Sequence, residues 1–169
     1  MRAVPFRTNR VKIVAMPNVL DTLRELGETL PTPPTPVAAY VPAVRSGNLL
    51  FVSGQLPLKD GQLLATGKVP SAVALEAAQR AARQCVLNAI AILGAEVGGD
   101  FTKLKRVVRI GVFVQSDDTF AEQHKVANGA SEFLQQVFGE QGRHARAAVG
   151  VNALPLNAAV EVECVFELH

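Results

Sequence analysis

The stretch KRVVRIGVFVQS, residues 105–116, constrains the fold most, because it is rich in β-branched residues and apolar on both alternating sides. A strand with apolar side chains on both sides is buried on both sides, which predicts a central strand of a sheet. The segments 71–97 before it and about 120–138 after it have the apolar spacing of amphipathic helices. Helices with one apolar face must pack on a sheet, so we predict an α+β protein with two layers.

Short strand patterns complete the predicted sheet. The segments AYVPAV and LLFVSG flank the turn residues SGN at 46–48 and predict a hairpin. The dipeptide DG at 60–61 marks a tight turn before QLLATG, a predicted third strand, and SDD at 116–118 is the predicted cap of the second helix. Two more strands, at 145–152 and 160–167, end the chain. The predicted order is β-β-β-α-β-α-β-β, with both helices on one face of a mixed sheet.

The N-terminal part of the chain differs from the rest. Residues 1–15 hold four basic side chains and no acidic one, and we interpret them as a basic N-terminal extension. Residues 16–37 combine a short amphipathic helix, predicted at 18–27, with PTPPTP at 31–36, a stiff polyproline-like connector. We predict that residues 38–169 form the single main domain.

The charge balance argues against a nucleic-acid partner. The chain has 17 basic and 15 acidic residues, and without the four basic residues of 1–15 it has 13 basic against 15 acidic ones. A nucleic-acid-binding protein has a clustered basic surface, so this mildly acidic domain is not expected to bind nucleic acid. The basic extension has two interpretations, a targeting segment or the product of a translation start upstream of a natural start at Met16. It lacks a long apolar region and a cleavage site, which argues against secretion.

Hydropathy and cysteine usage indicate the cytoplasm. No apolar run approaches the roughly 18 residues that a membrane helix needs, so no membrane partner is expected. Cys85 and Cys164 have no CxxC spacing and fall in a helix pattern and a strand pattern. Both are therefore predicted to be reduced thiols in the core of a cytoplasmic protein.

Charged side chains interrupt the two final strands, which otherwise consist mostly of small and apolar residues. Arg146 lies in the first of these strands, and Glu161 and Glu163 lie in the second. In each strand, one set of alternating residues can form a face that helices cover, and the set with the charges then forms the opposite face. A face that mixes small, apolar and charged groups suits contact with another subunit, with clefts where the charges lie. We therefore expect a homo-oligomer in which Arg146 and Glu161 both face away from the helices.

Three segments together resemble the Rid (YjgF) family, which is also called endoribonuclease L-PSP. They are YVPAVxSGNLLFVSGQLPL from Tyr40, RVVRIGVFV from Arg106 and RxxVGVxALPLxAAVEVE from Arg146, and the similarity spans about 38–168 in the right order. The resemblance implies a chorismate-mutase-like fold and a homotrimer with clefts between neighbouring subunits. It also implies the hydrolysis of reactive enamines and imines, such as 2-aminoacrylate, to 2-keto acids and ammonia, without a cofactor.

The same resemblance assigns roles to five residues. It makes Arg146 the residue that binds the substrate carboxylate and Glu161 the residue that positions water. Tyr40 would line the cleft, and Ser53 and Gly54 of the VSGQ segment would contribute hydroxyl and backbone contacts. Arginine suits its role because its planar guanidinium binds a carboxylate through two parallel hydrogen bonds and stays charged. Glutamate suits its role when its pKa lies near the working pH, since it then both orients water and transfers protons.

Two positions depart from the family pattern. The pocket asparagine of the family matches either Asn128 or His124, which are four residues apart and so share a helix face. The cysteine or serine usually found two residues after the arginine is Ala148 here, which removes a polar contact from the substrate pocket. Together with the segments KVANGAS and GRHARAAVGV, these departures indicate a less-characterised subgroup. The histidines lack the spacing of metal ligands, and no metal site is predicted.

Three functions compete at this stage. The first is a deaminase that hydrolyses 2-imino acids or enamines, based on Arg146 and Glu161. The second is a non-catalytic trimer that binds small carboxylates in a regulatory role, based on Ala148. The third is an endoribonuclease, as the family description says, and the mildly acidic domain argues against it. In the first two, the expected partner is a small carboxylate bound at subunit interfaces.

Overall fold

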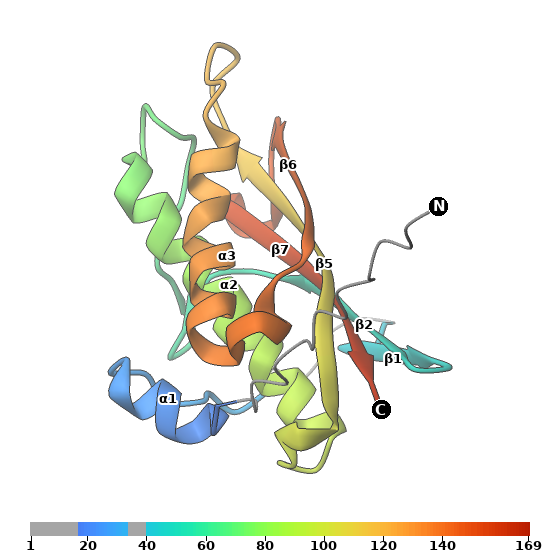
Figure 1. Cartoon of the computed structure of the whole chain (residues 1–169). Coiled ribbons are helices and arrows are strands. Elements are labelled where there is room, and N and C mark those ends of the chain that lie inside the picture. The colour runs from blue at the N-terminus through green and yellow to red at the C-terminus, as the bar shows by residue number, and fades with distance from the viewer. Residues whose placement is uncertain (1–16, 34–39) are drawn as a thin grey trace, which may run out of the picture.

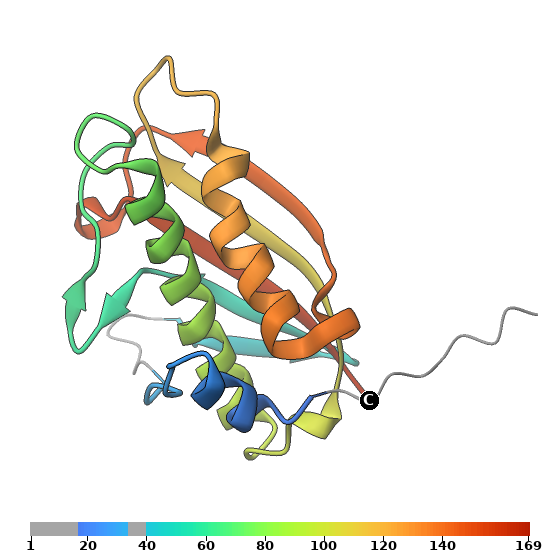
Figure 2. The same ribbon diagram turned by 60° about the vertical axis from the view of Figure 1, so that its left-hand side comes forward.

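The computed structural model describes residues 17–33 and 40–169, so the extension at 1–15 and part of the connector lie outside the described residues. The strands of the main sheet are β1 (Ala43–Ser46), β2 (Leu49–Gln55), β5 (Leu104–Gln115), β6 (Ala145–Val151) and β7 (Val160–Leu168). Their order across the sheet is β1-β2-β7-β5-β6. The long helices α2 (Leu75–Glu96) and α3 (Gln123–Phe138) lie side by side on one face of this sheet (Figure 1, Figure 2).

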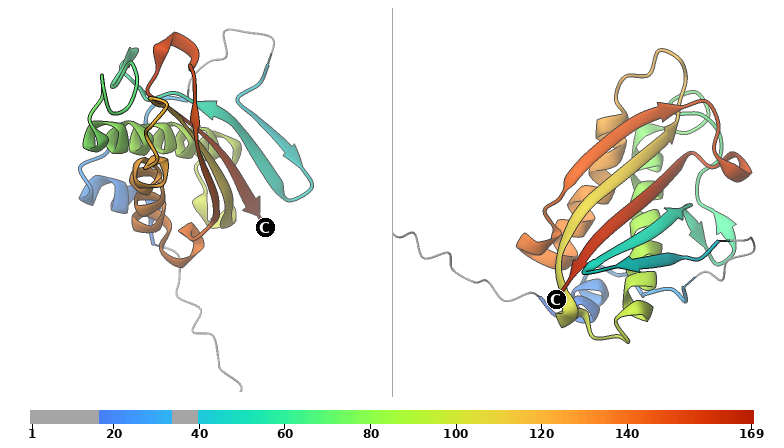
Figure 3. Two further views of the ribbon diagram at one scale, coloured as in Figure 1. Left: turned by 90° about the horizontal axis from the view of Figure 1, so that it is seen from above. Right: turned by 90° about the vertical axis from the view of Figure 1, so that its right-hand side faces the viewer.

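The pairing of the strands confirms the predicted fold class. β5 is a central strand, antiparallel to β7 on one side and parallel to β6 on the other, so the sheet is mixed. Both long helices cover the same face, and no helix of the described residues covers the other (Figure 3). β6 forms one edge of the sheet and β1 forms the other. The structure is therefore the two-layer α+β arrangement that the sequence predicts.

The short helix predicted at 18–27 is confirmed as α1 (Val19–Glu25). Its first turn is capped by the Asn18 side chain, which accepts hydrogen bonds from the backbone N–H groups of Leu20 and Asp21. Helix α1 packs against α3, and Val19 and Leu23 are buried there. None of the helices among the described residues has the length and the apolar character needed to cross a bilayer.

Two predicted elements differ from the structure. The third strand, QLLATG, is shortened to β4 (Gln62–Leu63), which pairs with β3 (Leu58–Lys59) in a separate two-stranded sheet. The second helix begins at Gln123, and its N-cap residue Glu122 makes no side-chain cap. The segment SDD is therefore not the cap, because the carboxylate of Asp117 accepts a hydrogen bond from the backbone of Ser71 instead.

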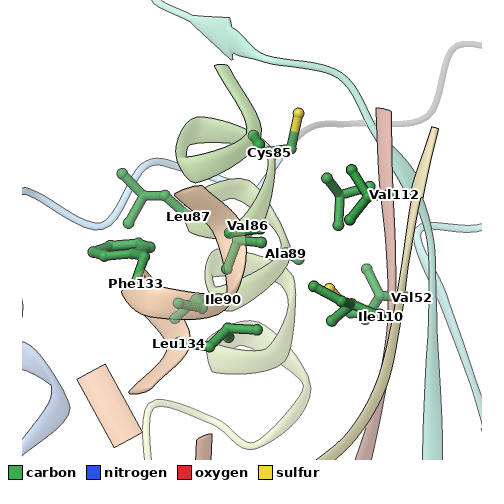
Figure 4. Packing of buried hydrophobic residues seen from close by; sticks show 14 of the residues in the cluster. Val52, Cys85, Val86, Leu87, Ala89, Ile90, Ile110, Val112, Phe133 and Leu134 are labelled. Carbon is green, nitrogen blue, oxygen red and sulfur yellow. The ribbon is translucent and has the colours of Figure 1, made fainter. Parts of the chain in front are cut away.

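The core lies between the helices and the covered face of the sheet, and aliphatic side chains dominate it. Figure 4 shows Val86 and Ile90 of α2 near Phe133 of α3, facing Ile110 and Val112 of β5. The many alanines of α2 bring the helix close to its neighbours. Both cysteines are buried and free, as predicted, and burial raises the pKa of the Cys164 thiol to about 12.

A close approach of the two long helices at Gly129 gives a stability prediction. A Cβ atom added at Gly129 of α3 would lie 2.1 Å from the carbonyl oxygen of Gln79 in α2. Alanine gains about 1 kcal/mol over glycine in a helix, but forced overpacking costs about 1–3 kcal/mol or more, and here the neighbour is backbone. We expect Gly129→Ala to lower the free energy of unfolding by about 2 kcal/mol, measured by urea denaturation. The exposed control Lys125→Ala should change it by less than about 1 kcal/mol, and an equal loss in both variants would contradict the prediction.

Candidate functional site

Arg146 and Glu161 lie on opposite faces of the sheet. Arg146 pairs with Ile110 of β5, and Glu161 pairs with Phe113 of the same strand. Directly paired residues share a face, whereas residues three positions apart on one strand point to opposite faces. Ile110 is fully buried under the helices, so Arg146 lies on the helix-covered face and Glu161 on the open face. The prediction that Arg146 faces away from the helices is therefore wrong.

The reason is the position of β6 at the edge of the sheet. At an edge, a long side chain on the helix side can run past the core, and Arg146 stays exposed in this way. Its Nη1 atom donates to Asn128 Oδ1 at 2.9 Å and to Ser131 Oγ at 3.0 Å. The two acceptors are three residues apart on α3, so one helix face holds the guanidinium.

A hollow of about 500 Å³ surrounds the Arg146 guanidinium. It is lined by polar and charged residues, namely Asn128, Ser131, Glu132, Gln135, Arg143, His144 and Arg146. His144 is hydrogen-bonded to Ser131, and so it joins the guanidinium to the loop before β6. The prediction did not include Ser131 or His144. The one signal for Ser131 was its i+3 spacing from Asn128 in KVANGAS.

The two alternatives for the pocket asparagine differ in their contacts. Asn128 contacts Arg146 directly, whereas His124 has an exposed side chain one turn earlier on α3. Ala148 follows Arg146 on the same face of β6 and is half-buried against the core. Its methyl group therefore adds an apolar wall two residues from the guanidinium, where related proteins are expected to have a polar group.

Glu161 is the centre of a second cluster, on the open face of the sheet. Its side chain is half-buried, and burial raises the pKa of its carboxyl above the ordinary value, with a smaller contribution from Glu163. The carboxylate packs on Gly54 of β2, where an added Cβ atom would lie 1.8 Å from Glu161 Oε1. Glycine at 54 is therefore required for the carboxylate to take this position.

Ser53 precedes Gly54 on β2, and Tyr40 lines the same cavity as Gly54. The Ser53 hydroxyl donates to the carbonyl oxygen of Val41 at 2.8 Å, so it fastens the segment that follows Tyr40 to β2. The Tyr40 ring is 56% exposed. Tyr40, Gly54 and Leu156 are among the residues that line a cavity of about 830 Å³ beside this segment.

The two clusters are too far apart to act on one small molecule within a single chain. Arg146 and Glu161 are two strands and three residues apart, so their Cα atoms are separated by about 14 Å. Their side chains also point to opposite faces. Each chain therefore presents two separate clusters, one with Arg146 and Asn128 and one with Glu161, Gly54 and Ser53.

In the described part of the chain, no three His, Cys, Asp or Glu side chains come together as metal ligands. Of the two clusters, a guanidinium such as that of Arg146 can bind an anion, and a carboxyl group such as that of Glu161 can exchange a proton.

Comparisons with known proteins identify the family to which the chain is similar. The chain matches the protein-family model described as Endoribonuclease L-PSP over residues 31–167. It is 45% identical to Protein TCP17 of Trypanosoma cruzi over 160 residues, which cover 94% of this chain and 99% of that protein. It is 31% identical to a 2-iminobutanoate/2-iminopropanoate deaminase of Dermatophagoides farinae over 135 residues, 80% of this chain and 90% of that protein. A crystal structure of an Agrobacterium tumefaciens protein of unknown function is similar with a TM-score of 0.86 and 47% identity, covering 90% of this chain and 93% of that one.

Proposed function

Because the chain belongs to the endoribonuclease L-PSP family, also called the Rid or YjgF family, we propose that it hydrolyses small imines and enamines that carry a carboxylate. The observation that carries this proposal is the pair of clusters, one with an anchored arginine and one with a half-buried glutamate of raised pKa. The relative from Dermatophagoides farinae, named as a deaminase of 2-imino acids, supports the same reaction class. The product would be a 2-keto acid together with ammonia.

Arg146 would bind the substrate carboxylate. Within the described residues, both hydrogen bonds of its guanidinium come from Nη1, which leaves the edge formed by Nε and Nη2 for a ligand. That edge presents two parallel N–H groups, which match the two oxygens of a carboxylate. Asn128 and Ser131 thus hold the guanidinium on the side away from the ligand, so that little freedom is lost when the substrate binds.

Glu161 would handle water and protons. In an imine, the oxygen of water bonds to the imine carbon and one of its protons moves to the nitrogen, which gives a carbinolamine. The remaining hydroxyl proton then moves to the nitrogen as the C–N bond breaks, so that ammonia leaves and the keto group remains. An enamine first takes a proton on its terminal carbon and loses one from its nitrogen, which converts it to the imine. A carboxyl group whose pKa is raised toward neutrality accepts a proton from water and returns it to nitrogen more readily than an ordinary one.

A complete site requires more than one copy of the chain, and we infer a homotrimer. The open face of the sheet carries Phe51, Val44 and Val149, which are 44%, 55% and 46% exposed. Exposed apolar side chains clustered around Glu161 and Glu163 are typical of a protein interface. In such an assembly, Glu161 on the open face of one subunit would meet Arg146 at the β6 edge of the next.

The proposal is tested by ammonia release from 2-aminoacrylate, which a dehydratase generates from serine in the same assay. We expect the protein to accelerate this release and Arg146→Lys to raise KM about 10- to 100-fold, because a point charge replaces two charge-assisted hydrogen bonds worth about 1.5–3 kcal/mol. Arg24→Lys, on the exposed surface of α1, is the control and should leave KM unchanged. Equal rates with and without the wild-type protein would overturn the proposal.

A second function, carboxylate binding without turnover, is favoured by Ala148, which offers no polar group to the substrate. In that case pyruvate would raise the melting temperature of the wild-type protein but not of Arg146→Ala. The shift would persist in Glu161→Gln, and no ammonia would be released. Turnover by the wild-type protein decides against this alternative.

A further inference from the structure

A chain of hydrogen bonds runs from the backbone through His144 and Ser131 to Arg146. His144 Nδ1 is 2.6 Å from the carbonyl oxygen of Gly142, and its Nε2 is 3.1 Å from Ser131 Oγ. Ser131 Oγ is in turn 3.0 Å from Arg146 Nη1. The imidazole therefore lies behind the hydroxyl group that contacts the guanidinium.

The chemistry of the two ends fixes the direction of every bond in this chain. A carbonyl oxygen accepts hydrogen bonds and cannot donate, so the neutral ring carries its proton on Nδ1, and Nε2 is an acceptor. The Ser131 hydroxyl then donates to Nε2, and its oxygen accepts from Arg146, which can act only as a donor. One arrangement of protons satisfies all three bonds.

We propose that Ser131 and His144 are positioning residues that hold the Arg146 guanidinium for the substrate, and that protonation of His144 weakens this hold. The consequence for catalysis rests on the function proposed above for Arg146. The hydrogen-bond chain itself rests on the geometry alone.

Protonation would change both the bonds and the charge. The Nε2 atom would become a donor, so Ser131 Oγ would face two donors and its own hydrogen would need another acceptor. An imidazolium and a guanidinium would then be joined through one oxygen atom, and their like charges repel. Arg143 lies in the same hollow and adds to the repulsion, whereas Glu132 there and Glu140, which pairs with Arg143, oppose it.

The direction of the pKa shift agrees with this arrangement. Partial burial is the main cause that lowers the pKa of His144 from 6.5, and the charge of Arg146 lowers it further, while the bond to Gly142 acts in the opposite sense. Because the pKa is lowered, His144 is neutral at pH 7, and the hold on Arg146 is intact there. It is lost as the pH falls through the lowered pKa, below 6.5.

A set of variants tests whether His144 and Ser131 hold the Arg146 guanidinium or only contribute to the stability of the fold. Glutamine at 144 places an amide oxygen near the site of Nε2 and does not titrate, so His144→Gln should keep KM within about 3-fold of wild type at pH 7.5. Wild-type KM should rise about 10-fold between pH 7.5 and 5, whereas His144→Gln should not show this rise. His144→Leu and Ser131→Ala should have KM raised about 10-fold at every pH, with kcat changed less, and Ser131→Thr should restore most of the loss. His169→Gln, at the exposed chain end, is the control and should keep the wild-type profile.

A spectroscopic measurement tests the chain of bonds without any activity. The ¹⁵N spectrum of the ring should show His144 protonated on Nδ1, and its titration should move upward in Arg146→Gln, since a positive neighbour is removed. A proton on Nε2, or a titration unchanged by Arg146→Gln, would overturn the positioning role. If KM of His144→Gln still rises between pH 7.5 and 5, protonation of His144 does not control the hold on Arg146. If the wild-type protein neither turns over nor binds pyruvate, the proposed function fails, and the spectrum still decides the hydrogen-bond chain.

Discussion

Replacing Glu161 by glutamine is expected to lower kcat for 2-aminoacrylate at least about 100-fold, because positioned acid–base groups contribute about 10²- to 10⁴-fold to proton transfer. Glutamine has nearly the same shape, so it should fit against Gly54 and still offer an oxygen to water, but it cannot accept a proton. The expected signature is a fall in kcat from ammonia release, while the affinity for pyruvate, measured by calorimetry, stays within about 3-fold. A parallel loss of affinity would instead mean that Glu161 belongs to the binding of the ligand.

Glu163 provides a matched control on the same strand and the same face. It is two residues from Glu161 and is paired with Arg109 at 2.8 Å. Exposed ion pairs contribute about 0–1 kcal/mol to stability, so Glu163→Gln should keep the maximal, pH-independent kcat within about 3-fold of wild type. A loss as large as that of Glu161→Gln would show that the two carboxylates act as a pair.

The control also has its own pH signature. Glu163 helps to raise the pKa of Glu161, so its neutralisation should lower that pKa. If ionised Glu161 is the active form, kcat of the wild-type protein should fall at acid pH with a midpoint above the ordinary carboxyl pKa of 4.5. This midpoint should move to lower pH in Glu163→Gln, and a shift to higher pH would contradict this assignment.

The layers of the fold could be predicted because burial leaves a periodic pattern in the sequence. β5 is apolar on both faces, and both helices have one apolar face, so their contact follows from the sequence alone. The hairpin β3–β4 is harder to predict, since two residues in each strand carry no periodicity. The start of α3 differs from the prediction because the Asp117 carboxylate accepts a long-range hydrogen bond from the backbone N–H of Ser71, which competes with local capping.

The sequence proposes some of the residues of the candidate site but does not give their geometry. Motif spacing identifies Arg146 and Glu161, but the face that each occupies depends on the register between strands, which a single sequence does not contain. A shift of one residue in the pairing of β5 with β6 would bring Arg146 to the face of Glu161. The contacts of Ser131 with Arg146 and of His144 with Ser131 join α3 to the edge of the sheet, and beyond the i+3 spacing of Asn128 and Ser131 no sequence pattern indicates them.

The separation of the two clusters leads to a second prediction with a large effect, complementation between two inactive variants. Arg146→Ala lacks the carboxylate anchor, and Glu161→Gln lacks the proton-transfer group. If one active site combines Arg146 of one subunit with Glu161 of its neighbour, a mixed oligomer contains some sites with both native residues. If both residues came from one chain, every site in such an oligomer would lack one of them.

Random assembly of equal amounts of the two variants should give both native residues at about one quarter of the sites, since each site draws one residue from each of two subunits. Co-expression with two different tags and purification over both would isolate the mixed oligomers. Their ammonia release should be well above that of either parent and on the order of a quarter of the wild-type rate, or somewhat more once homo-oligomers are removed. The parents, assembled separately and mixed just before the assay, are the control and should stay inactive.

Doubly tagged oligomers that are no more active than the parents would mean that Arg146 and Glu161 do not act across a subunit boundary. Within one chain the Cα atoms of Arg146 and Glu161 are about 14 Å apart and their side chains lie on opposite faces of the sheet, so the two residues would then not share a substrate.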